Sequence, residues 1–188
     1  MEEEIRRLLS YRRQEELDPF EVLAFLPIEA AQRVADIGCG PGYFTIPLAK
    51  YLLEGRLYAV DDRQEMLDAL RERVRKTRLG NVEIVESKGA PFPSMAEPLD
   101  GVFLAFALDQ VGTPEELMRG AAGLLRPGGW CAVVEWLNRE AADAPPVERL
   151  VPPDRWRELA PAAGLDFRWW RTIGGKYYMA LMRKRQEA

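Results

Sequence analysis

The sequence predicts an α/β fold built on a mostly parallel β-sheet with helices on both faces. Short apolar runs alternate with amphipathic segments along most of the chain, a pattern typical of strands connected through helices. The run near 101–108 is apolar throughout, as expected for a strand buried on both faces. Near the end of the chain, two strand-like segments flank Gly174-Gly175, which predicts a closing antiparallel pair.

The first part of the chain is predicted to be helical. Residues 2–17 have the pattern of one charged amphipathic helix. A second helix should begin at Asp18-Pro19, with Asp18 as the N-cap, Pro19 at the first helical position and Glu21 completing a capping box. Strands and helices then alternate: strand 33–37, a helix ending near 53, strand 56–60, helix 63–78 and a third strand at 82–85.

The later elements continue this alternation. Thr113-Pro114-Glu115-Glu116 predicts a helix start with a capping box. Residues 137–153 are polar and contain prolines without periodicity, so they are predicted to form an insertion loop. The remaining expected elements are a fifth strand at 129–136, a helix near 154–163 and the closing strands 165–171 and 176–182.

The composition indicates a single domain over residues 1–188. The chain is 47% hydrophobic and 30% charged, which is ordinary for a soluble globular protein. No apolar run approaches the 18 or more residues of a membrane span, by the usual rule of about 20. The acidic start, Met1 to Glu4, does not resemble a signal peptide, so we expect a cytoplasmic protein with no membrane contact.

Several kinds of chemistry are excluded by residue counts. The chain has no histidine, which excludes His-based acid–base catalysis, Ser-His triads and most zinc sites. Its two cysteines lie in separate predicted elements, so neither a disulfide nor a metal site is expected. The net charge of −4 argues against nucleic acid as a partner. The basic residues of helix 63–78 are interpreted as its solvated face: Arg71, Arg73, Arg75, Lys76 and Arg78.

The most informative segment runs from Asp36 to Gly42. It is a strand end followed by a turn with glycines at every second position, and it precedes a helix, whose N-terminus suits anionic groups. A second apolar strand ends in Asp61-Asp62, which indicates a nucleoside with a ribose diol. The dinucleotide pattern Gly-x-Gly-x-x-Gly fits poorly, because Tyr43 stands where its third glycine belongs. The Asp36 carboxylate would also repel a pyrophosphate but would suit an ammonium group.

These residues resemble the first motif of the class I S-adenosylmethionine-dependent methyltransferases (the type 11-like group), an acid followed by x-Gly-x-Gly-x-Gly. Asp61 matches the family's second acid, and the resemblance extends over roughly residues 30 to 184 through Val82–Val85, Asp100–Phe106 and Leu124–Gly129. It implies a Rossmann-like seven-stranded, mostly parallel sheet with the last strand antiparallel. It also implies S-adenosylmethionine as the cofactor, with the N-terminal helices (1–28) covering the site.

The resemblance also implies which residues bind the cofactor. Gly38 and Gly40 would line its methionine part, and Asp61 would accept both ribose hydroxyls. We expect an Asp61→Ala variant to lose cofactor binding without unfolding. The full set of expected cofactor-binding residues is Asp36, Gly38, Cys39, Gly40, Asp61, Asp62, Met66, Ser87, Lys88, Gly89 and Ala105.

One departure from the family pattern concerns adenine. The family commonly has Gly-Asp-Ala after the third strand, and the Asp accepts from the adenine amino group. Here the sequence is Ser87-Lys88-Gly89, and a lysine ammonium accepts no hydrogen bond. Adenine recognition would then use Ser87 or backbone groups, or would be weaker.

The expected reaction is in-line displacement of the methyl group onto a small-molecule acceptor. No dedicated base is obligatory, because the cofactor carries the reactive group. The candidates for the acceptor side are Phe106, Asp109, Glu135, Trp136 and Tyr178, of which Asp109, Glu135 and Tyr178 could take a proton. For Asp109 a turn-capping role is equally consistent, and for Glu135 a plain strand-end charge.

Other functions stay open at this point. A non-catalytic member of the fold, binding the cofactor or a partner, is compatible with Lys88 and with the absence of a recognition domain. An RNA or protein methyltransferase is disfavoured, because no Asn-Pro-Pro-Tyr follows the fourth strand and no RNA-binding module is present. A nicotinamide-dependent oxidoreductase is disfavoured by Asp36 and Tyr43. The acceptor atom and the oligomeric state are not indicated by the sequence.

Overall fold

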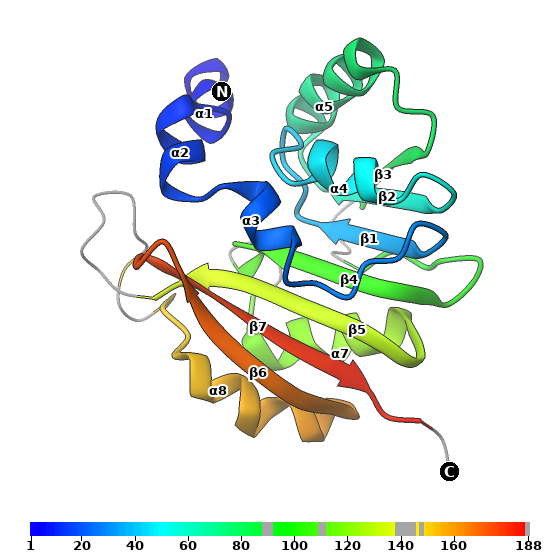
Figure 1. Ribbon diagram of the computed structural model, residues 1–188, viewed down its shortest axis with the longest axis vertical. Coiled ribbons are helices and arrows are strands. Elements are labelled where there is room, and N and C mark those ends of the chain that lie inside the picture. The colour runs from blue at the N-terminus through cyan, green and yellow to red at the C-terminus, as the bar shows by residue number, and fades with distance from the viewer. Residues whose placement is uncertain (88–91, 109–111, 138–145, 147–148, 187–188) are drawn as a thin grey trace. The chain divides into compact units, whose positions relative to one another are not determined.

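A computed structural model describes residues 1–87, 92–108, 112–137, 146 and 149–186 of the chain (Figure 1). It divides into two compact units, Met1–Pro93 and Ser94–Ala188. No helix of the described residues is long and apolar enough to cross a membrane.

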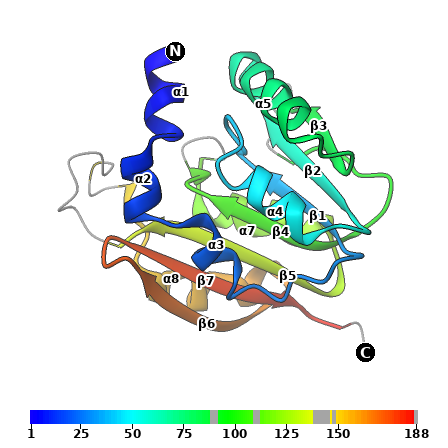
Figure 2. The ribbon, with the colours of Figure 1, turned by 45° about the horizontal axis from the view of Figure 1, so that its top comes forward.

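The first unit contains three parallel strands. They are β1 (Arg33–Ile37), β2 (Arg56–Asp61) and β3 (Val82–Glu86), with β2 between the other two. The connections are α4 (Thr45–Tyr51) and α5 (Gln64–Thr77), which both contact β2 (Figure 2). Ile37 pairs with Val60, and Asp61 pairs with Glu86, so the three carboxyl ends meet at one edge. The predicted strands and helices of this region are confirmed.

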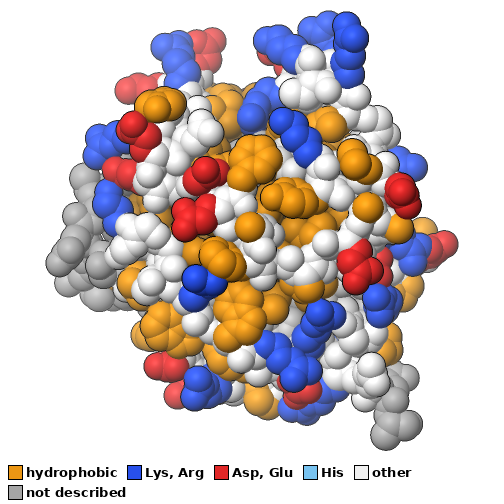
Figure 3. Space-filling view, in the orientation of Figure 1, with side chains coloured by type: hydrophobic (Ala, Val, Ile, Leu, Met, Phe, Trp, Pro, Cys, Tyr) orange, Lys and Arg blue, Asp and Glu red, His pale blue; other side chains and the backbone are white. Residues whose placement is uncertain are grey.

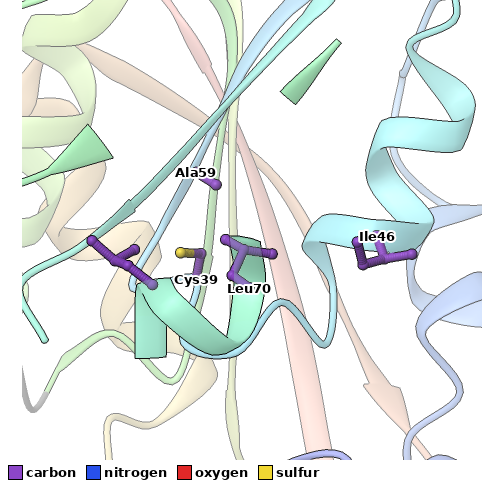
Figure 4. Packing of buried hydrophobic residues seen from close by; sticks show 5 residues of the cluster. Cys39, Ile46, Ala59 and Leu70 are labelled. Atoms are coloured by element: carbon purple, nitrogen blue, oxygen red, sulfur yellow. The ribbon is translucent and has the colours of Figure 1, made fainter. Parts of the chain in front are cut away.

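An apolar cluster attaches the helices of this unit to its strands (Figure 4). Ala59 of β2 contributes from the sheet and Ile46 from α4, while Leu67 and Leu70 contribute from α5. The fifth member is Cys39, whose side chain enters the cluster from the turn after β1. The turn is therefore held between the sheet and α5 by burial of apolar surface.

The N-terminal region differs from its prediction. Residues 2–17 form two helices, α1 (Glu2–Leu8) and α2 (Tyr11–Glu16), rather than one. The cause is the Ser10 side chain, which accepts a hydrogen bond from the Arg13 N–H and so caps a new helix. Asp18 is the N-cap of α3 (Pro19–Leu23) as predicted, but its side chain accepts from the Phe20 N–H at 2.8 Å and not, as the predicted capping box requires, from that of Glu21.

The second unit contains four strands in the order β4, β5, β7, β6. The parallel pair is β4 (Leu99–Ala105) with β5 (Leu125–Trp136). The closing pair is β6 (Leu165–Ile173) with β7 (Tyr177–Lys184), and β7 is antiparallel to both β5 and β6. Gly174 and Gly175 both have positive φ in the turn between β6 and β7, as predicted.

Helices cover this second group of strands as well. α7 (Pro114–Leu124) begins with the predicted capping box, in which Thr113 and Glu116 bond to each other's backbone N–H. α8 (Pro153–Leu159) continues into the short 3₁₀ helix η2 (Ala160–Ala163), and α8 contacts β6 and β7. Seven strands are thus found among the described residues, mostly parallel with β7 antiparallel, which confirms the predicted fold class.

Two strand boundaries in this unit were predicted wrongly. The strand expected at 101–108 begins at Leu99 and ends at Ala105. It stops because Phe106 adopts a φ of 57°, which is not an extended conformation. The strand expected at 129–136 begins earlier, at Leu125. Most of the predicted insertion loop, 138–145 and 147–148, lies outside the described residues.

Candidate functional site

The glycine turn after β1 is bound to the carboxyl end of β2. Gly38, Gly40 and Gly42 have φ values of 74°, 53° and 86°, in the left-handed region that side chains disfavour. The N–H groups of Gly38 and Cys39 both donate to the Val60 carbonyl, at 2.8 and 3.0 Å. Alternate glycines are needed here because the chain must turn sharply while it stays close to the neighbouring strand.

Two of these glycines serve different purposes. A Cβ at Gly42 would lie 2.4 Å from Leu70 Cδ1, so this glycine lets α5 approach the turn. A Cβ at Gly40 would have no heavy atom of the described residues within 4 Å. Gly40 therefore leaves room beside the turn, and a bound group could approach its backbone closely.

Asp61, at the end of β2, joins this turn to the turn that follows it. Its Oδ2 accepts from the Gly40 N–H at 2.8 Å, and its Oδ1 accepts from the Arg63 N–H at 3.0 Å. The residue is only 1% exposed. A carboxylate has about four lone-pair sites on its two oxygens, so this side chain type can accept from more than two donors.

This geometry corrects the expected effect of Asp61→Ala. Removing the carboxylate would leave the N–H groups of Gly40 and Arg63 without the acceptor that Asp61 provides in a buried turn. A buried donor left unsatisfied costs about 1–3 kcal/mol. The alanine variant would therefore lose stability as well as any ligand contact, and Asp61→Asn is the better probe.

Asp36 is the second buried carboxyl group of the turn region. It lies within β1, and its Oδ2 accepts from the Thr45 hydroxyl at 2.6 Å. Burial raises the pKa of Asp36 to about 7, and the nearby charge of Asp61 adds to the rise. A cationic group beside Asp36 would counter both effects, so the site suits an ammonium group.

The other expected cofactor residues of this unit occupy varied positions. Cys39 and Met66 bury their side chains, so a ligand could meet only the backbone of Cys39. Asp62 is exposed directly after β2, whereas Ser87 is buried and its N–H donates to the Asp61 carbonyl at 3.0 Å. Lys88 and Gly89 lie outside the described residues.

Sequence reasoning missed a role for Arg73. This α5 residue was assigned to a solvated face, but its Nη1 donates to the Pro41 carbonyl of the glycine turn at 2.7 Å. Arg71 and Lys76 are exposed and pair with Asp68 and Glu72, as a solvated face requires. Basic side chains gather over α5 at the top of Figure 3. No signal in the sequence marks a backbone carbonyl as the partner of Arg73.

Tyr178 does not have the position expected of a catalytic base. Its hydroxyl donates to the Val151 carbonyl at 2.6 Å and accepts from Trp156 Nε1 at 2.7 Å. Burial raises the pKa of Tyr178 above its ordinary value, which opposes loss of the proton. Glu135 pairs directly with Tyr178 across β5 and β7, so it lies on the same face and is likewise buried. Asp109 lies outside the described residues.

The opposite face carries three aromatic side chains. Trp136 and Tyr177 pair across β5 and β7, with ring centroids 4.8 Å apart. Phe106, next to Ala105 at the end of β4, lies 5.7 Å from Trp136 and 5.5 Å from Tyr177. Phe106 holds its left-handed φ of 57° in this contact, and such conformations concentrate at functional sites. Ligands of open α/β sheets bind at the carboxyl ends of strands, where β4 and β5 place these rings.

Comparison with known proteins identifies the family of the chain. A sequence profile of the methyltransferase domain family matches residues 34–129, which is half of the chain. The chain belongs to the class I S-adenosylmethionine-dependent methyltransferases. S-adenosylmethionine is therefore the cofactor that its family implies, as the sequence predicted.

Curated relatives of this methyltransferase are named trans-aconitate 2-methyltransferase. The one from Mycobacterium sp. (strain KMS) is 34% identical over 140 residues, covering 74% of this chain and 52% of the relative. The one from Variovorax paradoxus is 32% identical over 149 residues, covering 74% and 56%. The chain thus spans about half the length of the curated relatives that it matches.

Solved structures of other methyltransferases share the fold. A SAM-dependent methyltransferase from Aquifex aeolicus matches with a TM-score of 0.84 and 24% identity, covering 96% of this chain and 97% of that one. Coclaurine N-methyltransferase bound to N-methylheliamine and SAH matches with a TM-score of 0.70 and 14% identity, covering 88% and 71%. At these identities the likeness establishes the fold class.

Among residues 1–87, 92–108, 112–137, 146 and 149–186, no three His, Cys, Asp or Glu side chains group as metal ligands.

Proposed function

We propose that the chain transfers a methyl group from S-adenosylmethionine to a small-molecule acceptor. The observation that carries the proposal is the bond from the Gly40 N–H to Asp61 Oδ2 at 2.8 Å. This bond supports a ribose-binding turn, because it joins a buried carboxylate to a glycine beside which a Cβ would meet no described atom within 4 Å. When bound, the cofactor would supply a methyl group carried on a sulfonium sulfur. The acceptor nucleophile would bond to the methyl carbon in line with the breaking carbon–sulfur bond, and S-adenosylhomocysteine would leave.

The roles of the protein groups follow from their positions. Asp61 accepts the ribose hydroxyls, while Gly38 and Gly40 let the cofactor approach the turn. Asp36, buried beside Thr45, holds the ammonium group of the methionine part. These groups bind and orient the cofactor, and holding reactants in line lowers the barrier to such a transfer.

We propose no side-chain base for the transfer. The Tyr178 hydroxyl is engaged by Val151 and Trp156, and the paired Glu135 lies on the same buried face. An acceptor that is already nucleophilic, such as a carboxylate oxygen, needs no base. The names of the relatives favour this class, since trans-aconitate is a tricarboxylate.

The remaining expectations concern partners and location. We propose that the protein acts in the cytoplasm on a free small molecule rather than on nucleic acid. The net charge of −4 supports the exclusion of nucleic acid as the acceptor.

The test is transfer of radiolabelled methyl from S-adenosylmethionine to a panel of acceptors. The panel contains trans-aconitate, other small carboxylic acids, phenols, amines and bulk tRNA, and product is separated from cofactor before counting. We expect label on a small molecule and a large loss of label with Asp61→Asn. Label on tRNA alone would contradict the proposal. No label on any acceptor, with S-adenosylhomocysteine still bound, would favour the non-catalytic alternative.

A further inference from the structure

The residues before α3 contact both turns assigned to the cofactor. Glu4 of α1 lies 59 positions before Arg63, yet its Oε1 is 2.8 Å from Arg63 Nη1. Arg63 directly follows Asp61-Asp62, so this ion pair reaches the turn after β2. The Arg63 guanidinium, which donates to Glu4, holds the pKa of Glu4 below its ordinary value.

A second contact reaches the glycine turn. The Arg13 guanidinium stacks on the Tyr43 ring, 4.9 Å from its centroid, and the Tyr43 hydroxyl donates to the Leu17 carbonyl. Tyr43 directly follows Gly42, at the position where a dinucleotide motif would have its third glycine. The residue that breaks the dinucleotide pattern thus also contacts residues 1–17.

Arg63 connects the first contact to Asp61 itself. Its backbone N–H donates to Asp61 Oδ1 at 3.0 Å, and its Nε lies 3.7 Å from the same oxygen. With the Gly40 N–H on Oδ2, these contacts fix the orientation of the carboxylate. The far end of the same guanidinium donates to Glu4 Oε1, so Glu4 helps to hold Arg63 in its position beside Asp61.

The helices that supply these contacts are weakly held. Neither α1 nor α2 buries a residue, whereas α3 buries Pro19, Val22 and Leu23. Elements with little buried surface open at low free-energy cost, and elements that move on ligand binding come from this class. The polar contacts to Arg63 and Tyr43 therefore stabilise the docked state, in which residues 1–17 lie against the two turns.

We propose that Arg63 is a positioning residue for the cofactor ribose, oriented by Glu4, and that docking of residues 1–17 slows cofactor release. The inference rests on the proposed function. Because the docked segment orders both turns, it raises the affinity for the cofactor. By linkage, bound cofactor stabilises the docked state of the segment by the same free energy.

The experiment measures release of S-adenosylhomocysteine by stopped-flow competition from the full-length protein. Glu4→Gln removes the charge of the ion pair. Glu2→Gln is the matched control, since Glu2 forms an exposed ion pair with Arg6 within α1. A partly exposed ion pair is worth about 0.2–1 kcal/mol. We therefore expect Glu4→Gln to speed release about two- to fivefold, and Glu2→Gln to leave it unchanged.

A second variant and a second readout separate positioning from stability. Tyr43→Phe keeps the ring under Arg13 but removes the bond to Leu17, so it too should speed release. Hydrogen exchange of residues 1–17 should slow when S-adenosylhomocysteine binds, and less so in Glu4→Gln. If wild-type protein binds S-adenosylhomocysteine but both variants keep its release rate and its hydrogen exchange, the inference is overturned and the proposed function is not. A wild-type protein that binds no S-adenosylhomocysteine would overturn both the inference and the proposed function.

Discussion

At the scale of single residues, the two buried carboxyl groups differ in their partners. Asp61 accepts from two backbone N–H groups, whereas Asp36 accepts from the Thr45 hydroxyl. Hydrogen bonds from N–H donors favour the charged form of a carboxyl group, and burial without such donors disfavours it. Burial, with a smaller contribution from the nearby charge of Asp61, raises the pKa of Asp36 to about 7, although the Thr45 hydrogen bond lowers it.

The raised pKa of Asp36 predicts how stability depends on pH. Since the folded state binds this proton more tightly than the unfolded state, the stabilisation is complete below the ordinary pKa of 3.8 and is lost as the pH rises through about 7. Asp36→Asn stays neutral, so the variant should gain on the order of 1–3 kcal/mol over wild type at about pH 8 and little at about pH 4. Thermal unfolding without cofactor measures the difference.

The exposed neighbour Asp62 supplies the control for this prediction. Asp62→Asn removes a charge from the same turn without changing a buried group, so its pH profile should follow that of wild type. If Asp36→Asn and wild type lose stability in parallel between about pH 5 and pH 8, the proposed pKa of Asp36 is wrong.

At the scale of elements, the glycine turn and α5 depend on each other through Gly42. Gly42→Ala places a methyl group 2.4 Å from Leu70 Cδ1 at a φ of 86°, so we expect a loss of about 2–4 kcal/mol of stability. Gly40→Ala meets no described atom within 4 Å and should lose less stability, about 1–2 kcal/mol, but should weaken cofactor binding. Urea unfolding and ligand titration of both variants test this contrast. Equal losses of stability would show that Leu70 moves aside.

The capping box of α7 gives a second test at this scale. Thr113→Ala removes the side-chain acceptor for the Glu116 N–H, which should cost about 1 kcal/mol. For a chain of this length, the loss corresponds to a melting temperature lower by about 2–4 °C. Thr113→Ser keeps the hydroxyl and should melt close to wild type. If Thr113→Ser were as unstable as Thr113→Ala, the loss of stability would come from the missing methyl group and not from the missing hydrogen bond.

Elements also show where sequence reasoning succeeds and where it stops. β1, β2 and α5 were predicted within one residue, because apolar periodicity and the turns around them agree. The break at Ser10 was missed because a serine cap competes with a continuous amphipathic pattern. The face of Tyr178 depends on the β5–β7 register, and a shift of one residue would exchange it with Tyr177.

At the scale of the whole molecule, the fold and the family were predictable because motif order extends over most of the chain. The cofactor followed from Asp36, the alternate glycines and Asp61, which the structure places around one turn. The contacts of Arg63 and Arg73 were not predictable, since each depends on tertiary distances that no motif encodes. The substrate is likewise not encoded in the shared core. The chain spans about half the length of the relatives whose names include a substrate.

The most direct test of the central claim is calorimetric titration of the wild-type chain with S-adenosylhomocysteine, with NADH as the control ligand. We predict binding in the micromolar range for S-adenosylhomocysteine and none for NADH. Asp61→Asn should weaken binding about 10- to 100-fold, as expected for loss of a hydrogen-bonding carboxylate. Binding of NADH, or an affinity for S-adenosylhomocysteine that Asp61→Asn leaves unchanged, would contradict the account.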